Sequence, residues 1–531
     1  MRCIAKQLSA FLLVLAMAVS LAACNKPDQI WTQPSLGEST PAVSRNQVLT
    51  IGAHTLRAEE LNYFYIDAIN TYCNQYGYYI SLLIDTKSPL NSESNTDADG
   101  ITWADKFLDM AIENIKSTYQ LYDLATKSGF QLSDKDKNSI DDTMANLETN
   151  AKYYGYANAD PYLRAIYGKG ADESSYRAYL EICTIAESYY NAYAASLEYD
   201  DADLRSYEED KYWQYSSYNY AYYYLNVSTF LEGGIKDNDG NVSYTDEEKA
   251  AAVNAAKRIA EQLASSHYGD TANFDDAINT LLNTYFGTTG TRYASTKNEN
   301  VLYGSINNAH REWLIGIEND DNSTQTQVIR KEGDMAVIAN ESGSGENKAI
   351  TGFYVLRFGS ASDNNVLLKN VRHLLVAYKG GTTDAYGNKV YTNAEKNAAK
   401  EQAMQLLAAF QSTDLSEESF AMLADQHSDD GNGTTGGLYE DIYPGQMVAP
   451  FEAWCYDSQR KVGDFGLVQT VYGWHIMYYV GESQQTYRDY LITEDLRMEE
   501  LMQWIADLEE SADWELLTDK YVDLAYVINP S

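Results

Sequence analysis

The sequence has little cysteine. Five of its 531 residues are cysteines, they lie far apart, and none has the C-x-x-C spacing of zinc or redox sites. This argues against a metal site, and we expect neither a metal nor a cofactor. Whether two of Cys73, Cys183 and Cys455 form a disulfide stays open at this point.

Basic residues are also scarce. There are 39 Lys and Arg against 77 Asp and Glu, which gives a formal net charge of −38. Nucleic-acid phosphates require Lys and Arg, so this balance argues against a nucleic-acid partner. Most of the acidity is expected on a solvated surface that keeps the chain soluble.

Long hydrophobic runs are absent after the first two dozen residues, so no membrane-spanning helix is expected there. The N-terminus is different: Arg2 and Lys6 precede the apolar run LSAFLLVLAMAVSLAAC. This is the pattern of an export signal, predicted at 1–23. Its end, L-A-A-C, resembles the bacterial lipobox, in which Cys24 receives lipid. An ordinary signal peptide with an incidental cysteine is the alternative.

The mature chain is therefore expected on the extracytoplasmic face of a cell membrane, held by lipid on Cys24, most simply in a Gram-positive bacterium. Residues 24–46 are polar, with Pro and Ser, and form a linker. The chain is too long for one core, so two to four domains are expected. Helical patterns dominate 47–205 and return in 484–531.

Tyrosine is abundant, at 46 residues, and is concentrated at 62–79, 153–192 and 207–224. It buries area and keeps a polar group. Two interpretations stay open: a general use of tyrosine in place of phenylalanine, and surfaces that hold extended polypeptide.

The middle of the chain contains a repeat with a constant offset of 147 residues. G-G-I-K-D-N-D-G-N-V-S-Y-T-D-E-E-K starts at Gly233, and G-G-T-T-D-A-Y-G-N-K-V-Y-T-N-A-E-K starts at Gly380. Each of these two segments ends in a Thr-x-x-Glu capping box at the start of an Ala-rich helix. We therefore expect two copies of one β-α-α-α-β-β unit, at 206–360 and 361–483.

Two strand-like runs of the second copy contain a histidine each, His373 in VRHLLV and His475 in YGWHIM. In the first copy, His475 corresponds to Tyr354. His373 corresponds to Asn226 without gaps, or to Tyr224 with a two-residue insertion. Histidines present in one copy alone favour a function there over a role as core filling.

The second copy resembles the parvulin family of peptidyl-prolyl isomerases over about 361–483. The shared motifs stand in order: VRHLLV, the helix from Asn393, FAMLADQHSDD, GGL, GQMVAPFE and VQTVYGWHIM. The whole layout looks like the extracytoplasmic foldase lipoproteins (PrsA-like) and the periplasmic SurA-like chaperones. That resemblance implies an α+β multidomain fold: a helical chaperone module from 47–205 and 484–531 around two small antiparallel sheets, each covered by helices.

The resemblance also implies the site. Leu438, Met447 and Phe451 form the proline pocket. Asp430 is the polar group beside it, with Asp429 as the alternative one residue away, and loop capping as a role without chemistry. His373, His475 and Thr470 form a trio that orients and tunes the site.

Two departures from the family pattern alter these expectations. Gly437-Leu438-Tyr439 replaces the frequent G-D-L-G. Ala377-Tyr378-Lys379-Gly380 lacks the basic residues of phosphate-specific members, so selectivity for phosphoserine–proline is not expected. In the first copy, the shared G-T-T-G places Thr284 opposite Asp430, so 206–360 is expected to be an inactive domain used for binding or spacing.

The expected function is isomerisation of X–Pro bonds in unfolded or partly folded exported polypeptides. The alternative is a holdase with a vestigial isomerase site. A solute-binding lipoprotein is disfavoured, because no two-lobed α/β pattern is present. The sequence does not tell whether the chain forms a homodimer. His54, His267, His310 and His427 are expected to be surface or core residues.

Overall fold

The computed structural model describes residues 47–518 except 210, 237–240, 266–270, 320–324, 344–347, 385–386 and 432–434, and in addition Tyr526 and Ile528. The predicted signal peptide (1–23), Cys24 and the linker lie outside the described residues. The chain divides into two compact units, one formed by residues up to Glu198 and from Asp495 on, the other by Tyr199–Glu494.

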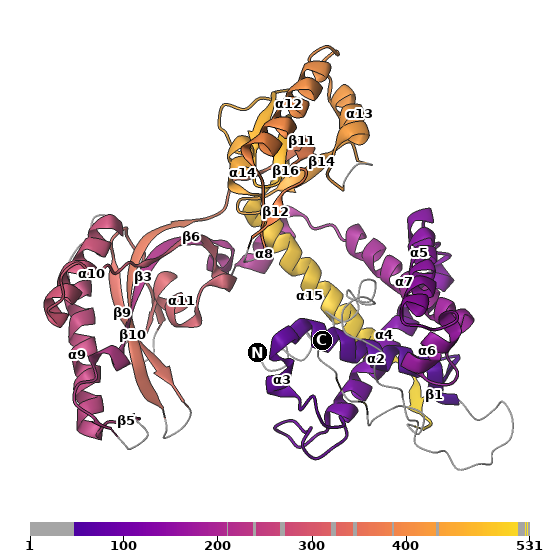
Figure 1. The fold of residues 1–531 in the computed structure, drawn as a ribbon, viewed down its shortest axis with the longest axis horizontal. Coiled ribbons are helices and arrows are strands. Elements are labelled where there is room, and N and C mark those ends of the chain that lie inside the picture. Colours follow the sequence, from indigo (N-terminus) through magenta and orange to yellow (C-terminus); the bar gives the residue numbers. More distant parts are fainter. Residues whose placement is uncertain are drawn as a thin grey trace. The chain divides into compact units, whose positions relative to one another are not determined.

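Helices dominate the first unit (Figure 1). Thr102, Ser133 and Asp172 each accept a backbone N–H three residues further on, which fixes three helix starts. The helices are α2 (Ala58–Tyr76), α3 (Ile80–Leu83), α4 (Trp103–Ser128), α5 (Asp134–Tyr153), α6 (Ala159–Tyr167) and α7 (Glu173–Ser196).

Tyrosines fill the core of this unit. The side chains of Tyr63, Tyr65, Tyr167 and Tyr176 are at most 3% exposed. The hydroxyl of Tyr63 is satisfied by Ser175 Oγ at 2.9 Å. These rings serve as core residues with a polar end, in agreement with the simpler of the two interpretations of the tyrosine content.

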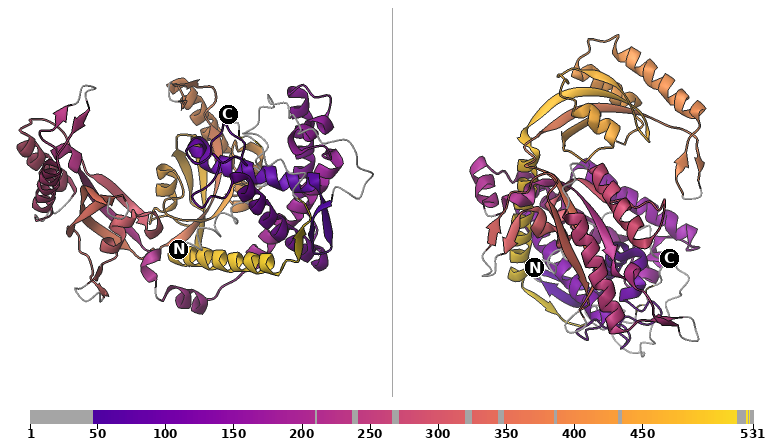
Figure 2. Two further views of the ribbon diagram at one scale, coloured as in Figure 1. Left: turned by 90° about the horizontal axis from the view of Figure 1, so that it is seen from below. Right: turned by 90° about the vertical axis from the view of Figure 1, so that its left-hand side faces the viewer.

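The C-terminal segment completes this unit. Helix α15 (Tyr487–Ser511), yellow in Figure 2, buries Leu501 and Ile505 against Leu121 and Tyr190. After it, β17 (Trp514–Leu516) pairs antiparallel with β1 (Gln47–Ile51), which also pairs with β2 (His54–Arg57). The expectation of helix throughout 484–531 is therefore wrong at Trp514–Leu516, where strand pairing with β1 satisfies the backbone, and at 484–486, which belong to the strand before α15.

The second unit contains two four-stranded antiparallel sheets with the same strand order, which confirms the predicted small antiparallel sheets. The first has the order β6-β3-β10-β9 and the second β14-β11-β16-β15. The first sheet and its helices are β3 (Ser217–Asn226), α9 (Asp246–Ala264), α10 (Thr271–Phe286), β6 (Thr296–Leu302), α11 (Asn308–Leu314), β9 (Met335–Ser342) and β10 (Ala349–Ser362). The second set is β11 (Leu367–Ala377), α12 (Asn393–Phe410), α13 (Glu417–His427), β14 (Leu438–Ile442), α14 (Ala449–Cys455), β15 (Phe465–Gln469) and β16 (Gly473–Thr486).

The four-stranded sheet of each copy has one strand more than the sequence predicts, β6 or β14, between the second and third helix of that copy. These edge strands are short and polar, so their sequences show no clear alternation of apolar and polar residues.

The capping boxes are as expected: the hydroxyls of Thr245 and Thr392 accept the N–H groups of Glu248 and Glu395. Short helices and short paired strands complete the unit: α8 (Asp201–Glu208), η3 (Tyr212–Tyr215), η4 (Val227–Phe230), β4 (Ile235–Lys236), β5 (Val242–Ser243), η5 (Tyr303–Ser305), β7 (Ile317–Asn319), β8 (Gln325–Gln327), β12 (Thr382–Thr383) and β13 (Lys389–Val390).

Each sheet has a core on both faces. In the second copy, Leu374, Val376 and Ile476 pack under α12 and α13. On the opposite face, Val371 and Met477 pack with residues of α14. This second face is the one that carries both histidines.

The three cysteines in the described part of the chain, Cys73, Cys183 and Cys455, are buried and form no disulfide with one another. This answers the question, left open by the sequence, of whether two of these three cysteines form a disulfide. Burial raises the pKa of the Cys455 thiol to about 12, so it stays protonated.

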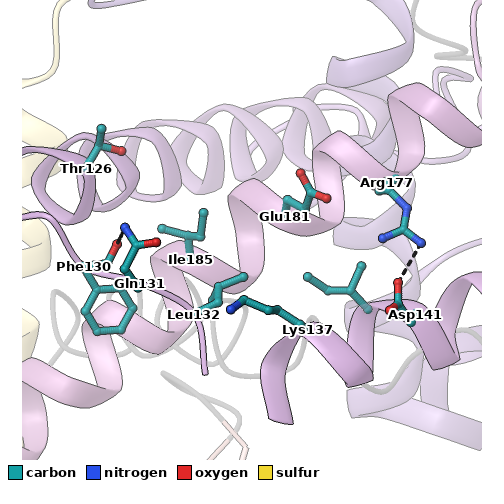
Figure 3. A pocket seen from close by; sticks show the side chains of 10 residues that line it. Thr126, Phe130, Gln131, Leu132, Lys137, Asp141, Arg177, Glu181 and Ile185 are labelled. Atoms are coloured by element: carbon teal, nitrogen blue, oxygen red, sulfur yellow. Dashed lines mark hydrogen bonds and ion pairs between the residues drawn. The ribbon is translucent and has the colours of Figure 1, made fainter. Parts of the chain in front are cut away.

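The first unit has a pocket of about 490 Å³ between the end of α4, the loop that follows it, α5 and α7 (Figure 3). Phe130, Leu132 and Ile185 give it apolar walls, and Arg177 donates to Asp141 at 2.9 Å on its lining.

A buried ion pair joins segments of the second unit. Arg488, at the start of α15, donates to Glu208 Oε2 from Nε at 2.7 Å and to the carbonyl of Tyr212 from Nη2 at 2.7 Å. The two side chains are 8% and 11% exposed, and Arg205 also contacts Glu208. A carboxylate in such a place is stable only while its partners remain.

Replacing Arg488 by Met is expected to destabilise the second unit by about 3 kcal/mol, the lower end of the range for a buried pair, because Arg205 still faces Glu208. Urea denaturation of the full chain, followed by circular dichroism, measures the change. The double variant Glu208→Gln with Arg488→Met is the control, and it is expected to recover part of the loss. Equal urea midpoints for wild type and Arg488→Met would contradict the assignment of Arg488 and Glu208 as a buried ion pair that stabilises the second unit.

Candidate active site

Two histidines lie side by side on one face of the second sheet. In the pairing of β11 with β16, His373 is opposite Met477 and His475 is opposite Leu375, so the histidines are diagonal neighbours. Their Nδ1 atoms are 3.2 Å apart, and the side chains are 3% and 5% exposed. The structure therefore brings together the two residues that the repeat comparison singled out.

Thr470 extends this pair from the end of β15. Its Oγ1 lies 2.9 Å from Nε2 of His475 and accepts the backbone N–H of Tyr472 at 3.2 Å. The side chain is buried, at 7% exposure. The threonine is thus held by the same turn that leads into β16.

Asp430 lies at the other end of the pair. Its Oδ2 is 2.9 Å from Nε2 of His373, but out of line with the N–H direction, so we describe the contact as electrostatic. The hydroxyl of Tyr439 donates to the same oxygen at 3.1 Å. The carboxylate is 29% exposed, which leaves one side of it open to a ligand.

Asp429, the alternative carboxylate, has a different role. Its Oδ2 accepts the N–H of Ala377 at 3.0 Å, and its Oδ1 is 3.3 Å from Lys379. Its own N–H donates to the carbonyl of Leu375 at 2.8 Å. Asp429 fastens the loop to β11, and Asp430 is the carboxylate of the site.

The acceptor-only character of Asp430 fixes the direction of the hydrogen-bond chain. A carboxylate oxygen 2.9 Å from Nε2 of His373 favours, by its charge, the tautomer that has its proton on Nε2, so Nδ1 of that ring is the acceptor. Nδ1 of His475 is then the donor, and its Nε2 accepts from the hydroxyl of Thr470. Both rings are neutral in this arrangement.

Burial agrees with neutral rings. It lowers the pKa of His373 to about 4, against the opposing effect of Asp430. It also lowers the pKa of His475 to about 4, with His373 adding to the effect. For Tyr439, burial and then the nearby Asp430 raise the pKa to about 12.

Phe451 and Met447 supply apolar surface beside the imidazoles. The ring of Phe451 lies 5.4 Å from both His373 and His475, and its side chain is 3% exposed. Met447 packs on the same cluster and is only partly buried. Phe451 therefore lies beside both imidazoles and Met447 packs on its cluster, and their role as a proline pocket stays a prediction.

Leu438 does not join them. In β14 it is opposite Arg372, whereas Tyr439 is opposite Val371, a residue of the histidine face. Alternation along a strand directs neighbouring side chains to opposite faces, so Leu438 faces away from the imidazoles. The prediction for Leu438 is wrong in geometry, and Tyr439, whose ring is 4.7 Å from His373, occupies the place.

The first copy has the same scaffold with exchanged side chains. Pairing of Tyr354 with Tyr224, and of Leu356 with Tyr222, makes Tyr222 the counterpart of His373. Both Asn226 and Tyr224 are wrong as counterparts, because η4 inserts four residues that the repeat comparison did not include. His475 does correspond to Tyr354.

The third residue of α11, His310, takes the place of Phe451 and contacts Tyr222 and Tyr354 at ring distances of 4.9 and 4.6 Å. Its side chain is 1% exposed, so it is a core residue. Thr284 lies inside α10 and donates to the carbonyl of Thr280, so it is not the counterpart of Asp430. The residues from 287 to 295 nevertheless contain no carboxylate.

The described residues contain no group of His, Cys, Asp and Glu side chains able to hold a metal ion. Among the helices within the described ranges, none is both long and apolar enough to cross a membrane.

Comparison with known proteins identifies the second copy. The family described as Rotamase, a PPIC-type PPIase domain, matches residues 373–481. Among solved structures, similar ones are the peptidyl-prolyl isomerase PrsA from Bacillus anthracis (24% identity, 28% of this chain, 59% of that chain, TM-score 0.17), PrsA from Bacillus subtilis (21%, 29%, 54%, 0.18) and PrsA from Bacillus cereus (18%, 56%, 97%, 0.21). The alignment thus spans 59% and 54% of the first two relatives. No curated protein matches the chain.

Both imidazoles are expected to stay neutral down to about pH 5, with the proton of His373 on Nε2 and that of His475 on Nδ1. An unfolded histidine has a pKa of about 6.5. At a pH between these two values the unfolded chain therefore binds more protons than the folded chain. The contribution of the two neutral histidines to the free energy of unfolding is complete above pH 6.5 and is lost as the pH falls toward 4. Imidazole ¹⁵N NMR reports tautomers and titration. A midpoint near 6.5 for either ring, or the opposite tautomers, would contradict the hydrogen-bond chain.

Proposed function

We propose that this chain isomerises X–Pro bonds in unfolded or partly folded exported polypeptides, from the premise that residues 373–481 form a parvulin-type peptidyl-prolyl isomerase domain. The observation that carries the choice of residues is the position of Phe451 beside His373, which Asp430 contacts, with Met447 packed on the same apolar cluster as Phe451.

The chemistry requires little more than a shaped surface. Rotation about an X–Pro amide has a barrier of roughly 18–20 kcal/mol, and the uncatalysed reaction takes tens to hundreds of seconds. A twisted amide has less charge separation than a planar one, so an apolar pocket favours the twisted form. Phe451 and Met447 supply that pocket for the proline ring.

The polar residues act by position. His373 and His475 are buried and neutral, so they do not exchange protons with the peptide. Among Asp430, the two histidines and Thr470, the partly exposed residue is Asp430, and we place its carboxylate toward the X–Pro amide of the bound peptide. We assign the two histidines and Thr470 to holding Asp430 and the pocket floor, because no proton has to move in the reaction.

The location of the chain belongs to the same proposal. The N-terminal sequence, with an export signal at 1–23 and L-A-A-C before the linker, supports lipidation of Cys24 and attachment to the extracytoplasmic face of a membrane. The helical segments 47–205 and 484–531 would then form a chaperone module, and 206–360 would bind or space clients without catalysis.

A second candidate function is holding of unfolded polypeptide by the helical unit. The pocket of Figure 3 favours it, because Phe130, Leu132 and Ile185 give it apolar walls while Arg177 and Asp141 form a polar edge suited to backbone and charged groups. In this case the chain would prevent aggregation without accelerating isomerisation.

Replacing Met447 by Ala in the full chain is expected to lower kcat/KM for a proline tetrapeptide at least tenfold, since about 1–3 kcal/mol is lost per missing apolar group. Asp430→Ala is expected to lower it about 10–100-fold, the equivalent of one charged hydrogen bond. A protease-coupled assay measures both. Leu438→Ala is the matched control with a near-normal rate. A wild-type rate equal to that of buffer would favour the holdase.

The combined variant Asp430→Ala with Met447→Ala tests the division of labour between the copies. It is expected to reduce the full chain to the uncatalysed rate, because Tyr222, Tyr354 and His310 replace the site residues in the first copy. Circular dichroism serves as the folding control. Turnover that survives in the folded variant would assign activity to 206–360.

A further inference from the structure

We propose that Tyr439 is a positioning residue of the isomerase site: its hydroxyl holds Asp430 beside His373, and its ring forms the pocket wall that Leu438 does not provide. This inference depends on the proposed function, because it concerns the same site. It adds a residue to the predicted constellation, at a position where the sequence departs from the family pattern.

The geometry gives Tyr439 two contacts with the site at once. Its ring centroid is 4.7 Å from that of His373, with the planes tilted by 48°. Its hydroxyl donates to Oδ2 of Asp430 at 3.1 Å. It belongs to the same apolar cluster as Met447 and Phe451. One side chain thus contacts the imidazole, the carboxylate and the apolar surface.

Asp430 requires such a partner. It lies in the connection between α13 and β14, outside regular structure, and its backbone N–H donates to Ser428 Oγ. The contact with His373 is out of line with the N–H bond, as described above. Lys379, which follows the end of β11, pairs with Asp429 instead. The Tyr439 hydroxyl is therefore the well-directed side-chain donor to this carboxylate.

The donor is available at neutral pH. Burial and the charge of Asp430 raise the pKa of Tyr439 to about 12, so the hydroxyl keeps its proton. A leucine at this position would supply a wall of similar kind without a donor. Phenylalanine at this position keeps the ring and removes only the donor to Asp430, whereas leucine removes both. Comparing the two variants with wild type therefore separates the role of the hydroxyl from the role of the ring.

The test compares full-length wild type, Tyr439→Phe, Tyr439→Leu and Tyr391→Phe. Tyr391 packs on the opposite, helix-covered face and is the matched control for loss of a tyrosine hydroxyl. We expect Tyr439→Phe to lower kcat about tenfold with KM within twofold, the effect of one lost hydrogen bond to a charged group. Tyr439→Leu is expected to raise KM as well, and Tyr391→Phe to behave as wild type.

A second measurement separates positioning from general support of the fold. The imidazole ¹⁵N signal of His373 is expected to shift in Tyr439→Phe and not in Tyr391→Phe. If Tyr439→Phe does not fold, Asp430→Asn weakens the same hydrogen bond and is expected to cause the same shift. An inactive wild type would overturn the proposed function. An active wild type whose rate and His373 signal are unchanged in Tyr439→Phe would overturn this inference alone, as would a lower rate without a shift.

Discussion

Two buried histidines in contact impose the main constraint on this site. At 3.2 Å between their Nδ1 atoms, one ring has to donate and the other has to accept, and both side chains are buried, so a lost partner is costly. Asp430 at one end accepts only, and Thr470 at the other can do either. The carboxylate therefore decides the tautomer of both rings and the direction of every hydrogen bond between them.

The first copy shows what the scaffold does without that constraint. The strand order and the two-faced core are the same, yet Tyr222, Tyr354 and His310 stand where the second copy has two histidines and a phenylalanine. Burial lowers the pKa of His310 to about 4, so this ring too is neutral. Three substitutions on one face leave the sheet intact because the other face carries a separate core.

A prolyl isomerase site of this type depends on shape and on weak electrostatics more than on reactive groups. That is why burial of the imidazoles is compatible with the proposed activity, and why the partly exposed Asp430 and Met447, together with the ring of Phe451, are assigned to the peptide. The same reasoning gives Tyr439 its importance, because a carboxylate in a connecting loop acts on a bound amide only when its orientation is held.

The sequence by itself determined the residue types, the order of the motifs and the repeat. His373 and His475 could be selected from it by comparing the two copies, whereas Thr470, Asp430, Met447 and Phe451 followed from the resemblance to the parvulin family. The capping boxes could be predicted as well, because a helix start depends on four consecutive residues.

Tertiary structure decided what depends on a partner strand or on an insertion. Whether Leu438 or Tyr439 faces the site is a matter of parity, which only pairing with β11 fixes. The counterpart of His373 in the first copy is Tyr222, and not Asn226 or Tyr224 as the repeat offset predicted, because η4 adds four residues to the first copy. The three-residue strand β17 exists through pairing with β1, more than 460 residues away in the sequence, and no local pattern contains that information.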